Sequence, residues 1–334
     1  MKTICIFYIM YLSICIITYF LCSHIIKNKY IHRFKSMDNS IKSKYTKQNT
    51  NINSKLNNIP IYFINLNQSS DRLKYMNEQI KFYNIQNVHR IEGIYGKSFT
   101  NKQKGTYTFG NNNKLNFEIN YYDNYNLSEL GCTLSHLYAI KTAYDNGNEY
   151  AIICEDDIYL GICQMWKFKL NDIINNAPDG WGLLQLYTFR NDITDYKVYK
   201  EWYYNYSALV YLVNRDCMRY ICDTLFVGNT IVIDRVESIS DIGKYSSITA
   251  DHFIYQYVQL ALGVYITMPL FISNNLLTST IDHDDTEHLI HSVNIYDKVY
   301  RSALEEKYMN HLDAKKTKIL MNDLKIIENF KINN

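Results

Sequence analysis

From Ile59 onward, short apolar segments rich in β-branched and aromatic residues alternate with segments that have helical apolar spacing. The strand-like segments are residues 59–66, 87–94, 149–154, 181–187, 207–213 and 263–268, and the helix-like segments are residues 72–83, 126–144, 215–225 and 251–262. Residues 97–125 are polar and irregular, and they predict a long loop over a site. Strands that alternate with helices pair mostly in parallel, with helices on both faces of the sheet. The sequence therefore predicts an α/β fold with a mostly parallel sheet flanked by helices.

The N-terminal segment Ile4–Ile26 is apolar and uncharged, and it is long enough for a helix that crosses a bilayer. It predicts a transmembrane helix that makes residues 1–26 a membrane anchor or uncleaved signal; a cleaved signal peptide is the alternative. The positive flank after the segment by itself places the rest of the chain in the cytosol. Residues 27–58 are polar and basic, so we expect a flexible stem there, a folded domain over 59–292 and a charged helical segment over 293–334.

Charge is distributed unevenly along the chain. The whole chain carries a net charge of +2 and residues 1–58 contribute +8, so residues 59–334 carry −6. A mildly acidic body argues against nucleic acid as a principal partner, because nucleic-acid binding depends on Lys and Arg contacts to phosphates. The body also holds five cysteines without a CxxC pair. This pattern indicates neither a zinc ribbon nor a complete disulfide framework.

Three consecutive acids, Glu155, Asp156 and Asp157, directly follow the apolar strand-like segment 149–154. In open α/β sheets, ligands bind beyond the carboxyl ends of the strands, so these side chains are expected at the rim of a crevice. Adjacent carboxylates repel one another unless a cation neutralises them. Mn²⁺ or Mg²⁺ would supply that charge through oxygen ligands while bridging a diphosphate. An acidic turn solvated by water is the alternative interpretation.

Two other motifs contain residues that suit a ligand site. The turn after the first strand carries Asn65 and Arg72, and a helix N-terminus together with a guanidinium suits phosphate. An exposed Arg in a first helical turn is the alternative. In the helix-like segment 126–144, Gly131 costs about 1 kcal/mol relative to Ala, which indicates close approach of another backbone or a ligand. His136 in the same segment is interpreted as an ordinary half-buried histidine or as part of the site.

Three motifs that occur in this order resemble the family 25 glycosyltransferases. They are INLNQSSDR, HRIEGIYGKS and LSELGCTLSHLYAIKTAYDNGNEYAIICEDDIYL, and the resemblance runs from Ile59 to about Leu160. The family includes bacterial lipooligosaccharide β-galactosyltransferases and the galactosyltransferase domain that acts on collagen hydroxylysine. The resemblance implies a GT-A-like fold, a UDP-sugar donor, usually UDP-galactose, and transfer with inversion to a hydroxyl of a glycan or modified protein. It also implies the secretory pathway with type II orientation. This is opposite to the cytosolic placement that the positive flank by itself indicates, so the orientation stays open.

The resemblance also implies roles for individual residues. Glu155 and Asp157 match the acidic motif that binds metal and ribose. Asn65 and Arg72 match positions that line the nucleotide pocket, although relatives often carry basic residues where this chain has Asn67-Gln68-Ser69-Ser70. Gly131, Ser135 and His136 fall on the helix beside that pocket.

An inverting transfer needs a carboxylate that deprotonates the acceptor hydroxyl, while a metal stabilises the leaving diphosphate. Asp251, at the start of a helix-like segment, is the first candidate for this general base, and Asp156 or an acid within residues 282–285 are alternatives. His283 or His288 is a further candidate metal ligand, with a plain surface loop as the alternative. Two other functions remain open: an inactive, membrane-tethered scaffold or binding protein, and a metal-dependent phosphohydrolase that cleaves a nucleotide-sugar.

Overall fold

The computed structural model describes part of the chain. The described residues are 21, 24–43, 52–120, 125–188, 196–198, 207–234, 248–274 and 286–296. None of the helices in these ranges has the length and apolar character that crossing a membrane requires. Most of the segment Ile4–Ile26 lies outside the described residues, as do residues 297–334, so the transmembrane helix and the C-terminal helical segment stay predictions.

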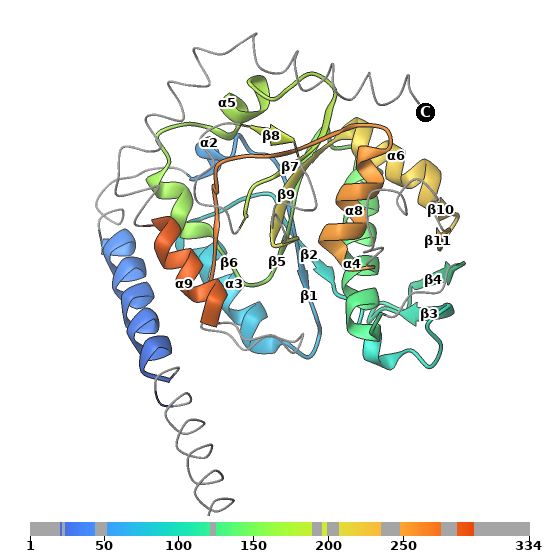
Figure 1. The fold of residues 1–334 in the computed structure, drawn as a ribbon, viewed down its shortest axis with the longest axis horizontal. Helices are drawn as coiled ribbons and strands as arrows, with labels where there is room; N and C mark the ends of the chain where they lie inside the picture. The colour runs from blue at the N-terminus through green and yellow to red at the C-terminus, as the bar shows by residue number, and fades with distance from the viewer. Residues whose placement is uncertain are drawn as a thin grey trace, which may run out of the picture.

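The centre of the fold is a seven-stranded sheet with strand order β2-β1-β5-β9-β7-β12-β8 (Figure 1). Its strands are β1 (Ile61–Asn65), β2 (Val88–Glu92), β5 (Tyr150–Glu155), β7 (Trp181–Gln185), β8 (Lys197–Val198), β9 (Val210–Asn214) and β12 (Gly263–Ile266). The strand β1 is parallel to β2 and β5, and β7 is parallel to β12, whereas β9 is antiparallel to both β5 and β7. The short edge strand β8 is antiparallel to β12. The predicted mostly parallel sheet is thus confirmed, with β9 and β8 as the exceptions.

Helices cover both faces of this sheet, as the alternating sequence pattern predicts (Figure 1). On one face lie α4 (Leu127–Asp145), α6 (Arg215–Leu225) and α8 (Ala250–Gln259); on the other lie α2 (Ile52–Lys55), α3 (Ser70–Phe82), α5 (Leu170–Asn175), α9 (Thr286–Ile295) and the 3-10 helix η2 (Leu160–Met165). Each face has its own apolar core. The helix α4 begins with the predicted capping box, in which the Asn126 side chain accepts a hydrogen bond from the Glu129 N–H at 2.8 Å.

A small second sheet replaces the loop that the sequence predicts over residues 97–125. It consists of β10 (Phe226–Val227), β11 (Thr230–Ile233), β4 (Lys114–Ile119) and β3 (Lys104–Thr108), in that order. The loop prediction is wrong here because alternate residues of β4, Leu115, Phe117 and Ile119, are buried against the α4 side of the core. Two short features lie between the larger elements. One is the antiparallel strand pair of β6 (Ile158–Tyr159) and β13 (Ile272–Ser273), and the other is the 3-10 helix η1 (Gly96–Ser98).

Residues 24–43 form a helix that packs on the body, where the sequence predicts a flexible stem. Phe34, Met37 and Ile41 are buried in the core on the α3 and α9 side. The Tyr159 hydroxyl also donates a hydrogen bond to Asp38 at 2.8 Å. The stem prediction is therefore wrong for this segment, because an apolar stripe at helical spacing is interleaved with the basic residues. The folded body includes residues that precede Ile59.

Candidate active site

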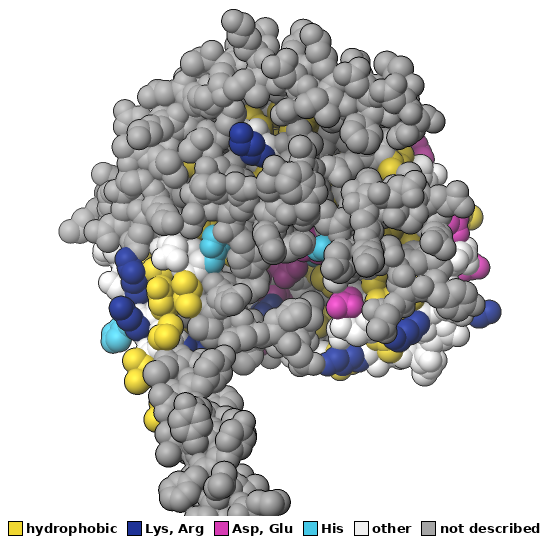
Figure 2. All heavy atoms as spheres, in the orientation of Figure 1, with side chains coloured by type: hydrophobic (Ala, Val, Ile, Leu, Met, Phe, Trp, Pro, Cys, Tyr) yellow, Lys and Arg dark blue, Asp and Glu magenta, His cyan; other side chains and the backbone are white. Residues whose placement is uncertain are grey.

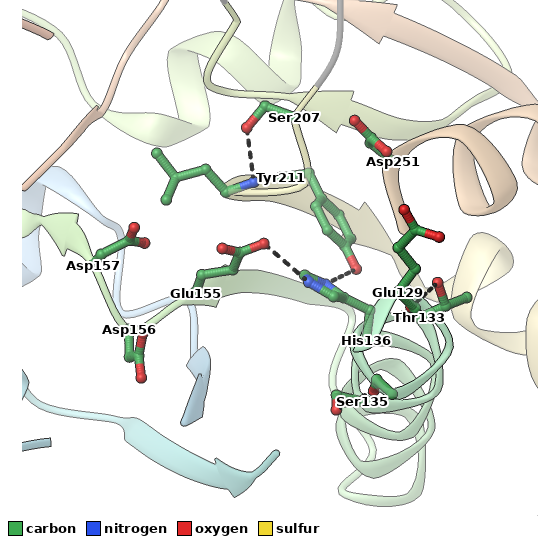
Figure 3. Close-up of polar contacts among 12 residues, drawn as sticks. Glu129, Thr133, Ser135, His136, Glu155, Asp156, Asp157, Ser207, Tyr211 and Asp251 are labelled. Carbon is green, nitrogen blue, oxygen red and sulfur yellow. Dashed lines mark hydrogen bonds and ion pairs between the residues drawn. The ribbon is translucent and has the colours of Figure 1, made fainter. Parts of the chain in front are cut away.

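The acidic trio lies at the carboxyl end of β5, near the centre of the main sheet (Figure 3). Glu155 is the last residue of β5, and Asp156 and Asp157 form the turn into β6. Because β1 runs parallel to β5, with Ile64 opposite Glu155, the end of β1 at Asn65 reaches the same edge of the sheet. Acidic side chains gather near the middle of the face shown in Figure 2, where the ends of these strands and α4 meet. The crevice predicted at the strand ends is present.

Asp156 joins three elements through its two carboxylate oxygens. Asn65 donates from Nδ2 to Oδ2 at 2.7 Å, and Arg72 of α3 donates from Nη1 to Oδ1 at 2.6 Å. Asp156 is 5% exposed, and burial raises its pKa, while Arg72 and Asn65 act in the opposite direction. This geometry disfavours Asp156 as a general base, because both oxygens already accept hydrogen bonds and the side chain is buried. Asp156 is placed to hold β1, α3 and β5 together.

Arg72 faces two of the three acids. Its Nη2 lies 3.8 Å from Asp157 Oδ2, in addition to the short contact with Asp156. Burial alone lowers the pKa of the guanidinium, but Asp157 and Asp156 outweigh it, so the pKa of Arg72 is raised. The guanidinium is therefore always charged, and it is held at the cleft by carboxylates.

The Glu155 side chain points toward His136 and lines the cleft described below, whereas Asp157 lies on the far side of Glu155 from His136 (Figure 3). The Asp157 and Glu155 side chains are 16% and 33% exposed. Asp157 Oδ1 is buried and has no hydrogen-bond partner within the described part of the chain, while Oδ2 accepts a long hydrogen bond from Ser273 at 3.4 Å. Burial raises the pKa of Asp157, and the neighbouring Glu155 and Asp156 raise it further against the pull of Arg72. Three carboxylates thus stand beside one guanidinium, which leaves the strand ends with excess negative charge.

A cleft with about 620 Å³ of empty space opens between these strand ends and α4. It is lined by the turn after β1, the loop 93–96 after β2, the first half of α4, and the end of β5. Its lining includes a basic, an aromatic, a thiol, an imidazole and an acidic side chain, which are those of Arg72, Tyr95, Cys132, His136 and Glu155. The first-strand turn and two of the three acids, Glu155 and Asp156, therefore share one cleft, and Asp157 directly follows them in the chain.

Gly131 and Ser135 attach α4 to the loop 93–96. A Cβ on Gly131 would lie 2.5 Å from Gly96 N and 2.6 Å from Ile94 O, so only glycine allows this approach. Ser135 Oγ accepts a hydrogen bond from the Ile94 N–H at 2.7 Å and donates one to the Gly131 carbonyl at 2.6 Å. The close approach predicted for Gly131 is made to another backbone. Both residues shape one wall of the cleft.

His136 is completely buried between α4 and β5 (Figure 3). Its Nδ1 lies 3.0 Å from the Tyr211 hydroxyl on β9, and its Nε2 lies 3.6 Å from Glu155 Oε1. His136 is fully buried, lines the cleft and lies next to one of the three acids, so its part in the site stays a prediction that this position is compatible with. His136 also connects the acidic end of β5 to the neighbouring strand.

Asp251 lies in the first turn of α8, on the side of the site where His136 and Tyr211 lie (Figure 3). It is half-buried, and its Oδ1 accepts a hydrogen bond from the His252 N–H at 2.9 Å. The cleft lining does not include it among the described residues. The other candidates for base or metal ligand, the acids within 282–285 with His283 and the His288 side chain, lie outside what the structure describes.

Three residues at the site were not identified from the sequence. Arg90 of β2 donates from Nε to Asn65 Oδ1 at 3.0 Å and from Nη2 to Asn67 Oδ1 at 2.7 Å, so it orients the amide that contacts Asp156. Cys132 lies one turn before His136 on α4 and lines the cleft. Tyr211 contacts His136 from β9. Only Cys132 carries a sequence signal, since its spacing of four from His136 places both on one helix face. Strand pairing brings Arg90 and Tyr211 to the site.

The segment that builds this cleft matches a known family. Residues 58–219 match the family model described as glycosyltransferase family 25 (LPS biosynthesis protein). This segment of the chain is therefore similar to the family 25 glycosyltransferases. A search among curated proteins found no match to the chain. The resemblance carried by the three sequence motifs is thus confirmed.

The matched segment contains the whole described cleft wall. It spans β1, the loop after β2, α4 and the acidic end of β5, and it extends through β9 into α6. Asp251 on α8 lies beyond the matched segment. The match therefore supports glycosyl transfer at the cleft. It gives no support for a role of Asp251, which rests only on this residue being a carboxylate near the site.

Proposed function

We propose that this protein is a metal-dependent, inverting glycosyltransferase that moves a sugar, galactose in the first instance, from a UDP-sugar to a hydroxyl of a glycan or modified protein. The observation that carries the proposal is the excess of carboxylate over guanidinium where the cleft meets β5. Three acids and one arginine gather there, within the segment that matches family 25. A site of this charge repels a diphosphate unless a cation binds with it. The donor and the cation are therefore expected to bind together, in a GT-A-like arrangement.

The residues present fit a hard divalent cation. Asp157 Oδ1 is a buried carboxylate oxygen without a hydrogen-bond partner in the described ranges, and the half-buried Glu155 offers a second carboxylate nearby. Mn²⁺ and Mg²⁺ prefer such oxygen ligands. Glu155 and Asp157 would hold the ion, and the bound ion would supply positive charge against the leaving diphosphate.

The protein's own residues have separate tasks in this proposal. Arg72 presents a permanently charged guanidinium at the cleft, and its contacts to Asp156 and Asp157 fix its position. Gly131 and Ser135 keep the loop 93–96 against α4, so the opposite wall is rigid. Such preorganised walls lower the entropic cost of aligning donor and acceptor. Asp251 is the proposed base, because it is a half-buried carboxylate on the same side of the site as His136.

The test is UDP release by the full-length protein, measured for a panel of UDP-sugars with and without acceptor glycans. We expect release that acceptor increases, that EDTA abolishes, and that Mn²⁺ or Mg²⁺ restores. Asp157→Asn should lower the rate at least 100-fold, whereas Asp179→Asn, at an exposed position, should leave it unchanged. Activity that survives EDTA would refute the metal role. Release that acceptor does not increase would favour a phosphohydrolase, and no release with any donor would favour an inactive relative.

A further inference from the structure

A second group of potential metal ligands lies on the α4 side of the cleft, and it goes beyond the cation proposed above. Cys132, His136 and Glu155 each place one donor atom, a thiol sulfur, an imidazole nitrogen and a carboxylate oxygen, within 4.8 Å of the other two. All three residues line the cleft. The sulfur distinguishes this group from the oxygen ligands at Asp157, because thiolate and imidazole favour zinc over Mg²⁺ or Mn²⁺.

The arrangement is close to the geometry that zinc requires. Cys132 and His136 are four residues apart on α4, so both side chains leave the same face of the helix. Zinc bonds of about 2.3 Å to sulfur and about 2.0 Å to nitrogen and oxygen, at tetrahedral angles, place the ligand atoms roughly 3.3–3.7 Å apart. His136 Nε2 and Glu155 Oε1 are already 3.6 Å apart. The Cys132 sulfur, within 4.8 Å of the other two atoms, has to approach them by at most about 1.3 Å.

The environment of His136 is an independent indication of a ligand. The ring is fully buried, and Nε2 has no hydrogen-bond partner among the residues that the structure describes. Its other nitrogen, Nδ1, lies 3.0 Å from the Tyr211 hydroxyl. When Nδ1–H donates to Tyr211, the lone pair of Nε2 faces the Glu155 carboxylate, and the two repel each other unless a cation lies between them. Histidine ligands of metals are oriented by such a contact from the second nitrogen.

Cys132 would bind zinc as a thiolate. Its side chain is half-buried, and its sulfur lies within 4.8 Å of donor atoms of His136 and Glu155. A zinc ion bound there would take the thiolate as its ligand, and the thiol proton would pass to solvent.

We propose that Cys132, His136 and Glu155 bind a zinc ion, with Tyr211 orienting the imidazole and the fourth position of the ion open to the cleft. Three protein ligands with one open position are the pattern of zinc sites that bind a water or substrate oxygen. Glu155 would contribute Oε1 to this ion, so the zinc site would share this residue with the cation site proposed at Asp157. The zinc site thus borders the site of the proposed transfer reaction.

The experiment uses the full-length protein, freed of metal by a chelator and titrated with Co²⁺ as a spectroscopic substitute for zinc. We expect a thiolate-to-cobalt charge-transfer band in the near ultraviolet, intense visible bands of a tetrahedral ion, and loss of both when Zn²⁺ is added. Cys132→Ser should abolish the charge-transfer band, and Cys222→Ser, at a half-buried cysteine on α6, should retain it. Absence of the band in the wild-type protein, or its survival in Cys132→Ser, would overturn the proposal.

Tyr211→Phe tests the site without removing a ligand, so it guards against loss of signal through misfolding. We expect the band to persist while Co²⁺ affinity falls about 10- to 100-fold. Release of one proton per Zn²⁺ bound, lost in Cys132→Ser, is the second readout. Unchanged affinity in Tyr211→Phe together with no proton release would count against the site. Because these readouts do not use activity, Mn²⁺-dependent UDP release without a cobalt band overturns the zinc site alone, and a cobalt band without UDP release overturns the transferase alone.

Discussion

Replacing Asp157 with Asn should stabilise the metal-free protein at neutral pH while removing its response to a divalent cation. In the folded state, burial and the neighbouring Glu155 and Asp156 raise the pKa of Asp157 from 3.8 to about 7. A carboxyl with a raised pKa holds its proton more tightly in the folded than in the unfolded chain. Its contribution to stability is therefore complete below pH 3.8 and is lost as the pH rises through about 7.

The size of this effect follows from the pKa difference. One pKa unit corresponds to about 1.4 kcal/mol, so an ionised Asp157 costs the folded state up to about 4 kcal/mol at pH 8. That cost already includes the attraction to Arg72 at 3.8 Å, and Asn removes this net cost. We therefore expect a gain of up to about 4 kcal/mol at pH 8 and less than about 1 kcal/mol at pH 4. A domain of this size gains roughly 2 °C in melting temperature per kcal/mol.

The assay is thermal unfolding of the full-length protein in EDTA from pH 4 to pH 8, repeated with Mn²⁺ and UDP. The wild-type melting temperature should fall relative to that of Asp157→Asn as the pH rises, and the ligands should raise only the wild-type value by a clear margin. Asp179→Asn, which replaces an exposed aspartate, is the matched control and should follow the wild type. The reasoning is refuted if Asp157→Asn is less stable than the wild type at pH 8, or if Mn²⁺ and UDP stabilise both equally.

Three further substitutions test the packing that positions the site. Gly131→Ala places a Cβ 2.5 Å from Gly96 N, and we expect a loss of about 1–3 kcal/mol in urea unfolding although alanine favours the helix. Arg72→Met leaves Asp156 with a single donor in a buried position and should cost about 3–5 kcal/mol in the same measurement. Phe34→Ala should cost about 3 kcal/mol, because this side chain of the N-terminal helix is 2% exposed.

The substitutions of Arg72 and Phe34 each have a matched control. Arg219→Met removes a surface arginine that is 57% exposed, and it should change stability by less than about 0.5 kcal/mol. Lys35→Ala changes an exposed position next to Phe34 and should be nearly neutral. A Phe34 substitution as mild as the Lys35 control would mean that residues 24–43 are a stem after all. A Gly131→Ala variant as stable as the wild type would show that α4 and the loop 93–96 separate easily.

Much of the secondary structure is encoded by residues that lie close together in the sequence. The alternating apolar segments indicate β1, β5, β7, β9 and β12, and the Asn126–Glu129 capping box marks the start of α4. These features depend on residues within one or two turns of each other, so they can be read without a fold. The position of the acidic trio after a buried strand is also local. The hairpin β3–β4 and the helix over residues 24–43 were missed, because short apolar stripes lie among polar residues there.

The contacts that define the site depend on chain segments far apart. Asp156 is held by Asn65 and Arg72, which precede it by more than eighty residues, and the partner of His136 is Tyr211 on an antiparallel strand. No spacing in the sequence encodes these pairs, since they arise from the strand order β1-β5-β9.

The sequence by itself therefore determined that an α/β sheet would carry three carboxylates at the end of one strand. Only the tertiary structure decided that Asp156 would pair with Arg72 and Asn65, and that Glu155 would line a cleft. It also decided that Cys132 and His136 would meet Glu155. The physical reason is that propensity and capping act over a few residues, whereas the charge balance of a buried site depends on whichever groups the folded chain brings within a few ångströms.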